Sequence, residues 1–304
     1  MLKTFRGSFM LLLAALIWGT AFVAQSKGMD YVEPFTYNAV RTLLGGVILM
    51  PIVYLFGRKG HKSAKAYSSK ISLLGGICCG LVLFAASSFQ QYGIAFTSAG
   101  KAGFITALYV VIVPIISIVT GRRPNIMIWI CVCIAVLGFY LLCIKEGFVL
   151  SKGDLFVLIC AFFYSLHIIV IDHFNSNGAD PVKMSCIQFF TAGTIMLICM
   201  FIFEEPSLKS VFDAKYTILY TGIMSCGVAY TLQIIGQKYT EPAAATLIMS
   251  LESVFAALAG WIILNEHMNL KEFAGCSLVF AAVVLSQLDI GSKKPITFDE
   301  KDNT

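Results

Sequence analysis

LAALIWGTAFVAQSKG, residues 13–28, is the stretch that decides the fold. It is strongly apolar and follows the basic residues Lys3 and Arg6, so three interpretations compete: a cleaved export signal, a core helix of a soluble protein, and a membrane span. A signal peptide usually precedes a soluble exported domain, whereas nine further long apolar stretches follow this one. The stretch is therefore interpreted as a first membrane span that remains in the mature protein.

The composition favours a lipid bilayer as the solvent for most of the chain. Hydrophobic residues make up 58% of the 304 positions and charged residues 13%, whereas a soluble domain usually carries about 25% charged residues. The formal net charge of +5 comes from basic residues in short clusters between apolar runs, which suits lipid headgroups better than nucleic acid. We therefore expect the bilayer as a partner and no nucleic acid.

The sequence lacks the common motifs of metal, redox and nucleotide chemistry. The ten cysteines form no Cys-x-x-Cys pair and have no histidine at zinc-ligand spacing, so they are interpreted as small buried apolar side chains. No phosphate-binding loop, His-Glu-x-x-His or Gly-x-Ser-x-Gly sequence occurs either. The predictions are no metal, no cofactor, no enzymatic activity, and a gradient rather than ATP as the energy source.

Ten stretches are long and apolar enough to cross a bilayer, which takes about 20 residues as a helix. Turn or charge signals separate them, among them GRKGHKSAKAYSSK, GRRPN and NSNGADP. The predicted spans lie at about 8–26, 35–56, 71–92, 98–120, 126–144, 154–172, 183–203, 215–235, 242–264 and 271–289.

The distribution of lysine and arginine predicts the orientation, because cytoplasmic loops carry an excess of both. With the N-terminus in the cytoplasm, fourteen of the 22 basic residues fall on the cytoplasmic side and seven on the other, and Arg41 lies within a span. The protein is therefore predicted to be a multi-pass plasma-membrane protein with both termini in the cytoplasm.

The chain contains a weak internal repeat that divides it near residue 150. AALIWGTA (14–21) aligns with CAFFYSLH (160–167), EPFTYNAVRTLLGG (33–46) with DPVKMSCIQFFTAG (180–193), and TSAGKAGFI (97–105) with TEPAAATLI (240–248). Apolar helices resemble one another by chance, but the matched spacing from proline to glycine in the middle pair is less easily accidental.

Five is an odd number of spans, so the second repeat enters the membrane from the opposite side. Such an inverted-topology repeat in transporters places the substrate site near the bilayer midplane, between the repeats. The predicted fold is an all-α integral membrane protein with ten transmembrane helices in two inverted five-helix repeats. Residues 1–149 are predicted to form the first repeat, 150–290 the second, and 291–304 a polar cytoplasmic tail.

Several segments resemble the EamA-domain transporters of the drug/metabolite transporter superfamily. AALIWGTAFV resembles the first span of that family and YNAVRTLLGGVIL its second, with Arg41 at the position of the family's arginine. Residues 241–285 resemble the ninth and tenth spans, with Glu252 in the LE of a recurring LEP and Glu266 at the acidic residue that ends the ninth span. The likeness covers almost all of 8–289.

The resemblance implies ten helices, two EamA repeats and movement of small metabolites, often outward, without naming the substrate. The sequence departs from the family pattern in two places. Ser253 stands where a proline commonly follows the glutamate, which predicts a straighter helix there. Arg122 and Arg123 stand where an acidic residue often ends the fourth span, so no acidic role is transferred to them.

Arg41 is the first candidate for substrate binding, because an ionisable group at the centre of a bilayer costs about 2.5–3.5 kcal/mol on insertion scales. Asn38 and Gly45 share its helix face. Arg41 is interpreted as binding a substrate carboxylate or pairing with Glu252. The alternative is a side chain that extends to the outer headgroups, and the sequence alone does not decide between them.

Glu252 is the second candidate, since it lies near the middle of the ninth span, too deep to reach the headgroups. It is interpreted as a proton-coupling or amine-binding group, with an interhelical hydrogen bond as the alternative. Aromatic and polar residues complete the predicted cavity, although each alone also fits a packing position. They are Trp18, which aligns with Tyr164; Tyr109, which aligns with Glu252; His167, Gln188, Tyr230 and Gln233; and Gln90 and Gln91 at the end of the third span.

The sequence thus predicts a secondary transporter that moves a small, partly apolar zwitterion, such as an amino acid or a related metabolite, by alternating access. Export across the plasma membrane is expected, and proton coupling and uniport are both left open. The alternatives are a multidrug exporter of the same superfamily and a membrane sensor or scaffold that does not transport. The predicted partners are the small-molecule substrate and the bilayer, with a homodimer left open.

Overall fold

The computed structural model describes residues 2–59, 67–97, 99–121, 124–143, 151–263 and 269–292, and every regular element in these ranges is a helix. The first half of the chain forms α1 (Leu2–Gly28), α2 (Pro34–Lys59), α3 (Ser69–Ile94), α4 (Ala99–Thr106), α5 (Tyr109–Val119) and α6 (Ile126–Cys143). The second half forms α7 (Lys152–Ser176), α8 (Pro181–Phe203), α9 (Leu208–Asp213), α10 (Lys215–Tyr220), the π-helix η2 (Thr221–Ala229), α11 (Tyr230–Gln237), α12 (Pro242–Met249), α13 (Leu251–Ile263) and α14 (Leu270–Ser292). Glu266, Arg122 and Arg123 lie outside the described residues, as does most of the predicted tail.

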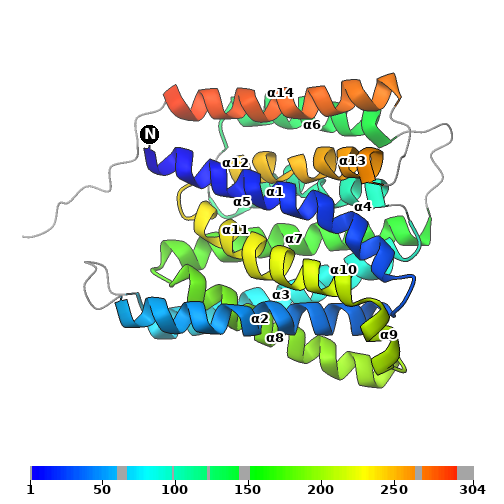
Figure 1. Cartoon of the computed structure of the whole chain (residues 1–304). Helices are drawn as coiled ribbons and strands as arrows, with labels where there is room; N and C mark the ends of the chain where they lie inside the picture. Colours follow the sequence, from blue (N-terminus) through cyan, green and yellow to red (C-terminus); the bar gives the residue numbers. More distant parts are fainter. Residues whose placement is uncertain are drawn as a thin grey trace, which may run out of the picture.

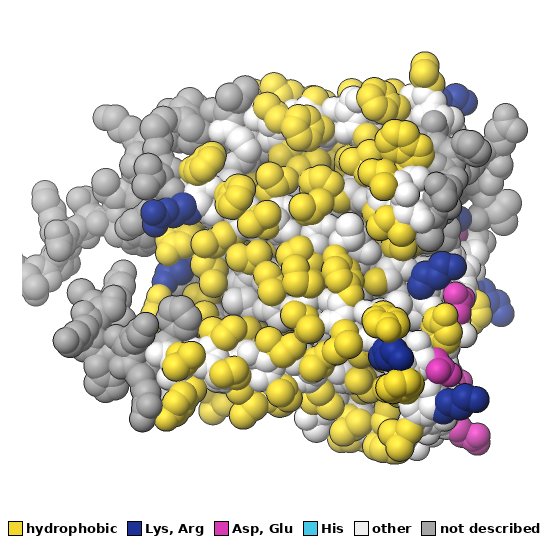
Figure 2. Space-filling model, in the orientation of Figure 1, with side chains coloured by type: hydrophobic (Ala, Val, Ile, Leu, Met, Phe, Trp, Pro, Cys, Tyr) yellow, Lys and Arg dark blue, Asp and Glu magenta, His cyan; other side chains and the backbone are white. Residues whose placement is uncertain are grey.

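The outer surface carries an apolar belt between two charged rims. Figure 2 shows hydrophobic side chains across the middle of one face, with charged side chains at its two edges. Phe201 and Ile202 are 69% and 66% exposed, which is unfavourable in water and expected against lipid tails. Nine helical segments in the described ranges have the length and hydropathy of a membrane span, and the shorter α6 takes the remaining place. The predicted all-α membrane fold is confirmed.

Two of the predicted spans are interrupted, and the interruptions fall at equivalent positions of the two repeats. The fourth span divides into α4 and α5 at Ala107 and Leu108, and the ninth divides into α12 and α13 at Ser250. In the register that aligns 97–105 with 240–248, Ala107 is equivalent to Ser250, and the first residue of α4 is equivalent to the first residue of α12. The repeat in the sequence is therefore also a repeat of local structure.

Hydrogen bonds of Ser250 accompany the interruption of the ninth span. The Ser250 hydroxyl donates to the Leu247 carbonyl oxygen over 2.7 Å, and serine side chains that bond back to the preceding turn bend helices. The Ser253 N–H donates to the Ser250 carbonyl oxygen in a tighter turn. The interruption lies three residues before Ser253, and α13 continues unbroken through Ser253 itself. The eighth span has an irregularity of its own, the nine-residue π-helix η2.

The two repeats are interleaved rather than placed side by side. The α1 helix of the first repeat packs against η2, α11 and α13 of the second, and α7 packs against α3, α4 and α5 of the first. Two other helix pairs join counterparts of the two repeats, α2 with α8 along one edge and α6 with α14 along the other (Figure 1). A two-fold pseudo-symmetry axis through the centre produces this exchange, which the sequence did not predict.

Two pairs of glycines fix equivalent helix crossings. A Cβ on Gly7 would lie 3.0 Å from the Gly236 carbonyl oxygen, and a Cβ on Gly236 would lie 3.0 Å from that of Gly7. Similarly, a Cβ on Gly93 would lie 2.9 Å from the Gly153 carbonyl oxygen, and one on Gly153 would lie 2.7 Å from that of Gly93. In the repeat registers Gly7 is equivalent to Gly153 and Gly93 to Gly236. The absence of a side chain at these positions lets α1 approach α11, and α7 approach α3, with the backbones in contact.

Side-chain contacts show which loops share an end of the molecule. Lys238 donates to the Tyr67 hydroxyl and Lys183 to the Ser69 hydroxyl, both over 2.7 Å, and Gly7 lies beside the end of α11. We call this end the N-terminal end, because α1 begins there, and the other end the opposite end. The loops that follow the second and eighth spans are therefore together, as an odd number of spans in each repeat requires.

Carboxylates tie helices together at the opposite end. Glu204, which follows α8, accepts hydrogen bonds from the backbone N–H groups of Phe35 and Thr36, each over 2.6 Å, and so caps α2. Asp154 in the first turn of α7 accepts from Lys101 Nζ of α4 over 2.6 Å. These bonds fix α2 and α7, two of the helices that carry pocket residues.

Candidate functional site

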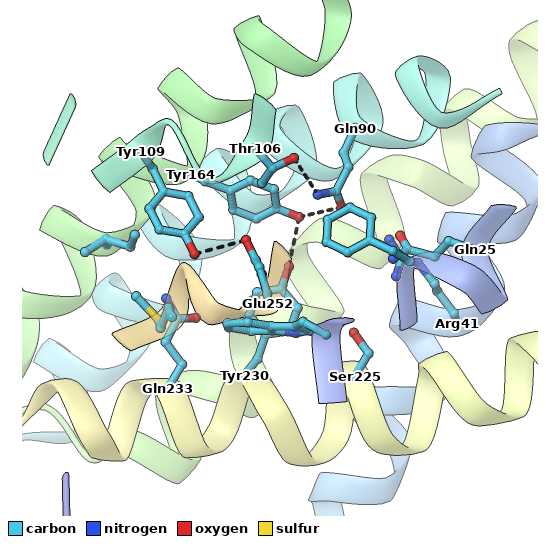
Figure 3. Close-up of a pocket in the computed structure, with 14 residues that line it drawn as sticks. Gln25, Arg41, Gln90, Thr106, Tyr109, Tyr164, Ser225, Tyr230, Gln233 and Glu252 are labelled. Atoms are coloured by element: carbon cyan, nitrogen blue, oxygen red, sulfur yellow. Dashed lines mark hydrogen bonds between the residues drawn. The ribbon is translucent and has the colours of Figure 1, made fainter. Parts of the chain in front are cut away.

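A pocket lies at the centre of the molecule and draws its walls from both repeats (Figure 3). It leaves about 450 Å³ between the lining side chains, including the space at its mouth. Most of the residues predicted from the sequence line it, namely Trp18, Arg41, Gln90, Tyr109, Tyr164, Tyr230, Gln233 and Glu252. The others, Asn38, Gln91, His167 and Gln188, do not line the pocket.

Arg41 brings a buried positive charge to the pocket. Its side chain is 3% exposed, and its Nε donates to Asn38 Oδ1 over 2.9 Å. Asn38 in turn donates to the Ser87 carbonyl oxygen of α3, also over 2.9 Å, and the guanidinium lies 5.6 Å from the centre of the Tyr37 ring. Arg41 is thus held among neutral neighbours and lines the pocket instead of extending to the headgroups.

Glu252 brings a buried carboxyl group to another wall. It is 4% exposed, and its Oε1 accepts a hydrogen bond from the Tyr109 hydroxyl over 3.0 Å. These two residues are equivalent in the register that aligns 97–105 with 240–248. A residue that contacts its own equivalent lies close to the axis that relates the repeats, so the Tyr109–Glu252 pair marks the centre of the molecule.

The ion pair considered between Arg41 and Glu252 is not formed. In the described part of the chain no carboxylate lies within salt-bridge distance of Arg41, and the ion pairs found there are Lys27–Asp30 and Lys101–Asp154. Figure 3 shows Arg41 beside Gln25, well apart from the Tyr109 hydroxyl that binds Glu252. The pocket therefore offers a cation and a carboxyl group at separate places.

A chain of hydrogen bonds connects four polar side chains along the pocket. The hydroxyls of Tyr164 and Tyr230 are 2.9 Å apart, and Tyr164 donates to Gln90 Oε1 over 3.1 Å. Gln90 Nε2 lies 3.4 Å from the Thr106 hydroxyl, to which it donates. The Trp18 ring packs edge-on against the Tyr230 ring, with centroids 4.9 Å apart. Side chains from both repeats thus hold the shape of the pocket.

Three lining side chains carry buried polar atoms that have no hydrogen-bond partner. They are Trp18 Nε1, Gln25 Oε1 and Gln233 Oε1. Buried polar atoms in proteins are nearly always paired, and an unpaired one costs about 1–3 kcal/mol. A ligand that accepts from the indole and donates to the two amides would remove this cost.

The residues that do not line the pocket contact the lining or one another. Asn38 positions Arg41 through the bond already described. His167 and Gln188 are both fully buried, with His167 Nε2 and Gln188 Oε1 3.0 Å apart. The His167 ring packs edge-on against Tyr230, with centroids 6.0 Å apart.

Several lining residues were not predicted, and for one group the sequence held a usable signal. Phe22 and Gln25 follow Trp18 at i+4 and i+7, so they share its helix face. Ser225 and Tyr230 are five residues apart, a spacing that points about 140° apart on an α-helix. Because η2 is a π-helix that ends just before Tyr230, α-helical periodicity does not apply there. The other unpredicted lining residues are Thr106, Ile168 and Met249.

Comparison with known proteins places the chain among transporters. A model of the EamA-like transporter family matches it twice, over residues 5–144 and 151–288. An uncharacterized transporter of Archaeoglobus fulgidus is 31% identical over 284 residues, which cover 92% of this chain and 85% of that protein. The uncharacterized inner membrane transporter YedA of Escherichia coli K12 is 26% identical over 287 residues, which cover 90% of this chain and 88% of that protein.

A solved crystal structure shares the fold. It matches this chain with a TM-score of 0.76 at 17% sequence identity, over 93% of this chain and 96% of that one. At this level of identity the likeness concerns the arrangement of the helices and not the chemistry of the pocket.

Proposed function

The chain belongs to the EamA-like transporter family of the drug/metabolite transporter superfamily, and from this premise we propose the cargo, the direction and the driving force. The protein is proposed to export amino acids or related small zwitterions across the plasma membrane. Alternating access to the central pocket is the proposed mechanism, because inverted repeats in transporters surround a shared central site.

The observation that carries the proposal is a buried cation and a buried carboxyl group at separate places in one aromatic pocket. The Arg41 guanidinium has no carboxylate partner in the described residues, so a substrate carboxylate can take that place. The Glu252 carboxyl group, held by Tyr109, can accept from a substrate ammonium group. The rings of Trp18 and Tyr164 line the same space and suit an apolar body between the two charges.

Glu252 is the group that we assign to proton coupling. A carboxyl group within a membrane carrier commonly marks a proton pathway. In the proposed cycle Glu252 takes up a proton when the pocket faces outward and releases it when the pocket faces inward. The proton enters while the substrate leaves, so the proton gradient drives export.

The proposed location is the plasma membrane, with both termini in the cytoplasm. Lys183 and Lys238 lie at the N-terminal end, and the excess of basic residues in the sequence falls on the loops of that end. Asp154 and Glu204 lie at the opposite end. This distribution supports the orientation.

A multidrug exporter of the same superfamily is the less favoured alternative. Aromatic walls with one carboxyl group suit lipophilic cations. The positive charge of Arg41 in the same lining opposes such a cargo, whereas it attracts the carboxylate of a zwitterion.

Transport by the purified protein in liposomes tests the proposal. The probes are labelled neutral amino acids, matching amines that lack the carboxylate, matching carboxylic acids that lack the ammonium group, and a lipophilic cation. Saturable flux of an amino acid, with the amine and the acid carried less well, is the expected result. If no probe shows saturable flux while thermal unfolding proves the protein folded, transport of these compounds is excluded and a sensor or scaffold becomes the better interpretation.

Replacing Arg41 gives the first prediction. Arg41→Ala removes a charge-assisted hydrogen bond worth about 1.5–3 kcal/mol, so the KM for an amino acid rises about 10- to 150-fold. The KM for the matching amine changes little, because the amine has no carboxylate. Asn38→Ala is the matched control, because it keeps the charge of Arg41 and removes only the hydrogen bond from its Nε. It should raise the KM for the amino acid less. An equal rise of the KM for the amino acid and for the amine would contradict a carboxylate-binding role.

A further inference from the structure

His167 and Gln188 form a buried polar pair whose hydrogen bonds are incomplete. Both side chains are fully buried, and they bond to each other over 3.0 Å. His167 Nδ1 and Gln188 Nε2 remain without a partner. Because the Gln188 oxygen faces His167 Nε2, the imidazole donates from Nε2, which leaves His167 Nδ1 as a free acceptor and the Gln188 amide nitrogen as a free donor. Two unpaired polar atoms side by side point to a ligand that reaches them in another state of the protein.

The repeat places Gln188 where Arg41 stands in the other half. The two residues are equivalent in the register that aligns 33–46 with 180–193, and each lies seven residues after the proline that begins its helix. Because α2 begins at the opposite end and α8 at the N-terminal end, Gln188 lies as far from the N-terminal end as Arg41 lies from the opposite end. In an inverted repeat, a residue in one access state has the surroundings that its equivalent residue has in the other access state.

The two ends of the pocket are closed differently in this structure. Near the N-terminal end Asn175 Nδ2 donates to the Ile234 carbonyl oxygen over 2.8 Å, and Gln237 Nε2 to the Ile168 carbonyl oxygen over 3.2 Å. These bonds join α7 to α11, and we call them the amide latch.

The equivalent positions at the opposite end are apolar. They are Met29 for Asn175 and Ile94 for Gln237. A longer hydrogen bond joins α1 to α3 nearby, from Gln91 Nε2 to the Gln25 carbonyl oxygen over 3.4 Å. In this structure Arg41 lines the pocket and Gln188 does not.

We propose that Gln188, with His167, is the counterpart of Arg41 when the carrier opens toward the N-terminal end. In that state the two side chains line the pocket and bind the polar end of the substrate through the imidazole and amide. The assignment rests on the proposed transport function. Since the neutral pair cannot match the charge of Arg41, a carboxylate is bound more weakly from the N-terminal side than from the opposite side.

Chemical accessibility tests the proposal without any substrate. Single cysteines replace Gln188, Arg41 and Ser225 in a chain freed of its native cysteines, and vesicles of both orientations receive a membrane-impermeant thiol reagent. Gln188→Cys is expected to react only from the N-terminal side, and Arg41→Cys and Ser225→Cys only from the opposite side. Met196→Cys, fully buried on the same helix as Gln188, is the matched control and should not react.

Reaction of Gln188→Cys from the opposite side, or no reaction from either side while Ser225→Cys reacts, would overturn the assignment. Neither outcome depends on which substrate is carried. The accessibility experiment therefore still decides the assignment if none of the probes shows saturable flux.

Sided kinetics then test the chemistry with whichever amino acid is transported. Gln188→Leu should raise the KM measured from the N-terminal side about 5-fold, the effect of one lost hydrogen bond, and leave the KM from the opposite side unchanged. Arg41→Gln should do the reverse. An equal rise of the KM on both sides in Gln188→Leu would show a structural role and contradict the proposal.

Discussion

Arg41 is kept within the second span by neighbours on its own helix. Asn38, one turn earlier, accepts a hydrogen bond from its Nε, and the Tyr37 ring lies near the guanidinium. Neither neighbour is an anion, so the positive charge stays available to a ligand. A lysine at this position would lack the planar fork that bonds Asn38 while leaving the terminal nitrogens free.

The role of Glu252 is tested by a change that keeps its shape. Glu252→Gln retains an oxygen that accepts from Tyr109 but does not take up a proton. Substrate exchange should persist, while proton movement and the pH dependence of net flux disappear. The measurement is flux in liposomes under an imposed pH gradient, with a pH-sensitive dye inside.

Tyr109→Phe is the complementary control for Glu252→Gln, because it removes the hydrogen bond that Glu252→Gln retains and keeps the carboxyl group. It should alter the rate and preserve proton movement. Unaltered proton movement in Glu252→Gln would remove the coupling role from this residue.

At the scale of residues, the sequence identified side chains whose polarity is unusual so deep within a membrane span. Arg41 and Glu252 stand out because charge is costly in lipid, and alignment of the repeats adds Trp18 and Tyr164. The sequence could not show whether Arg41 and Glu252 form an ion pair, because the distance between them depends on how α2 and α13 pack. Ser225 was missed because its neighbourhood follows the period of a π-helix.

At the scale of helices, the amide latch is expected to set the balance between the two states. Asn175→Leu removes a hydrogen bond worth about 0.5–1.5 kcal/mol, so the population open at the N-terminal end should rise about 2- to 12-fold. Spin labels on the exposed residues Ser176 and Tyr239 report this as a longer distance between α7 and the end of α11.

Asn177→Leu is the matched control for the latch. Asn177 is exposed, and its amide donates to the His173 carbonyl oxygen of its own helix. Its replacement should leave the distance distribution unchanged. The same distribution in Asn175→Leu and in the unmodified protein would show that the amide latch does not control opening.

The crossing of α1 and α11 depends on the absence of a side chain. In Gly236→Ala the new Cβ would lie 2.9 Å from Leu11 Cγ and 3.0 Å from the Gly7 carbonyl oxygen, so the helices must separate. Overpacking of this kind typically costs about 1–3 kcal/mol, which should lower the melting temperature in detergent.

Gly100→Ala is the matched control for this crossing, because no atom lies within 4 Å of a Cβ placed there. It should melt close to the unmodified protein. Equal melting temperatures for the two variants would mean that the crossing tolerates a side chain.

At the scale of the whole molecule, the placement of the loops can be tested directly. Single cysteines at Tyr67 and Lys238 should react with an impermeant reagent from one face of the membrane, and a cysteine at Asp30 from the other. The reason is that six spans, an even number, lie between positions 67 and 238, whereas a single span lies between Asp30 and Tyr67. Reaction of the positions 67 and 238 from different faces would overturn the inverted arrangement.

Much of the overall architecture could be predicted, because a membrane fixes the length and polarity of each helix. The ten apolar stretches and the matched proline-to-glycine spacing sufficed for an inverted repeat. The exchange of α1 and α7 between the repeats was not predictable. It depends on close approaches such as Gly7 to Gly236, and a sequence pattern shows that a glycine is present without showing what lies against it.

Tyr109 and Glu252 meet although they descend from the same position of the repeat. Had the carrier been assembled from two copies of one short chain, each residue there could have faced only a duplicate of itself, and two glutamates would repel. Fusion of the copies into a single polypeptide removes that restriction. It allows a carboxylic acid and the phenol that donates to it to face each other on the axis, where a symmetric dimer would have two identical residues.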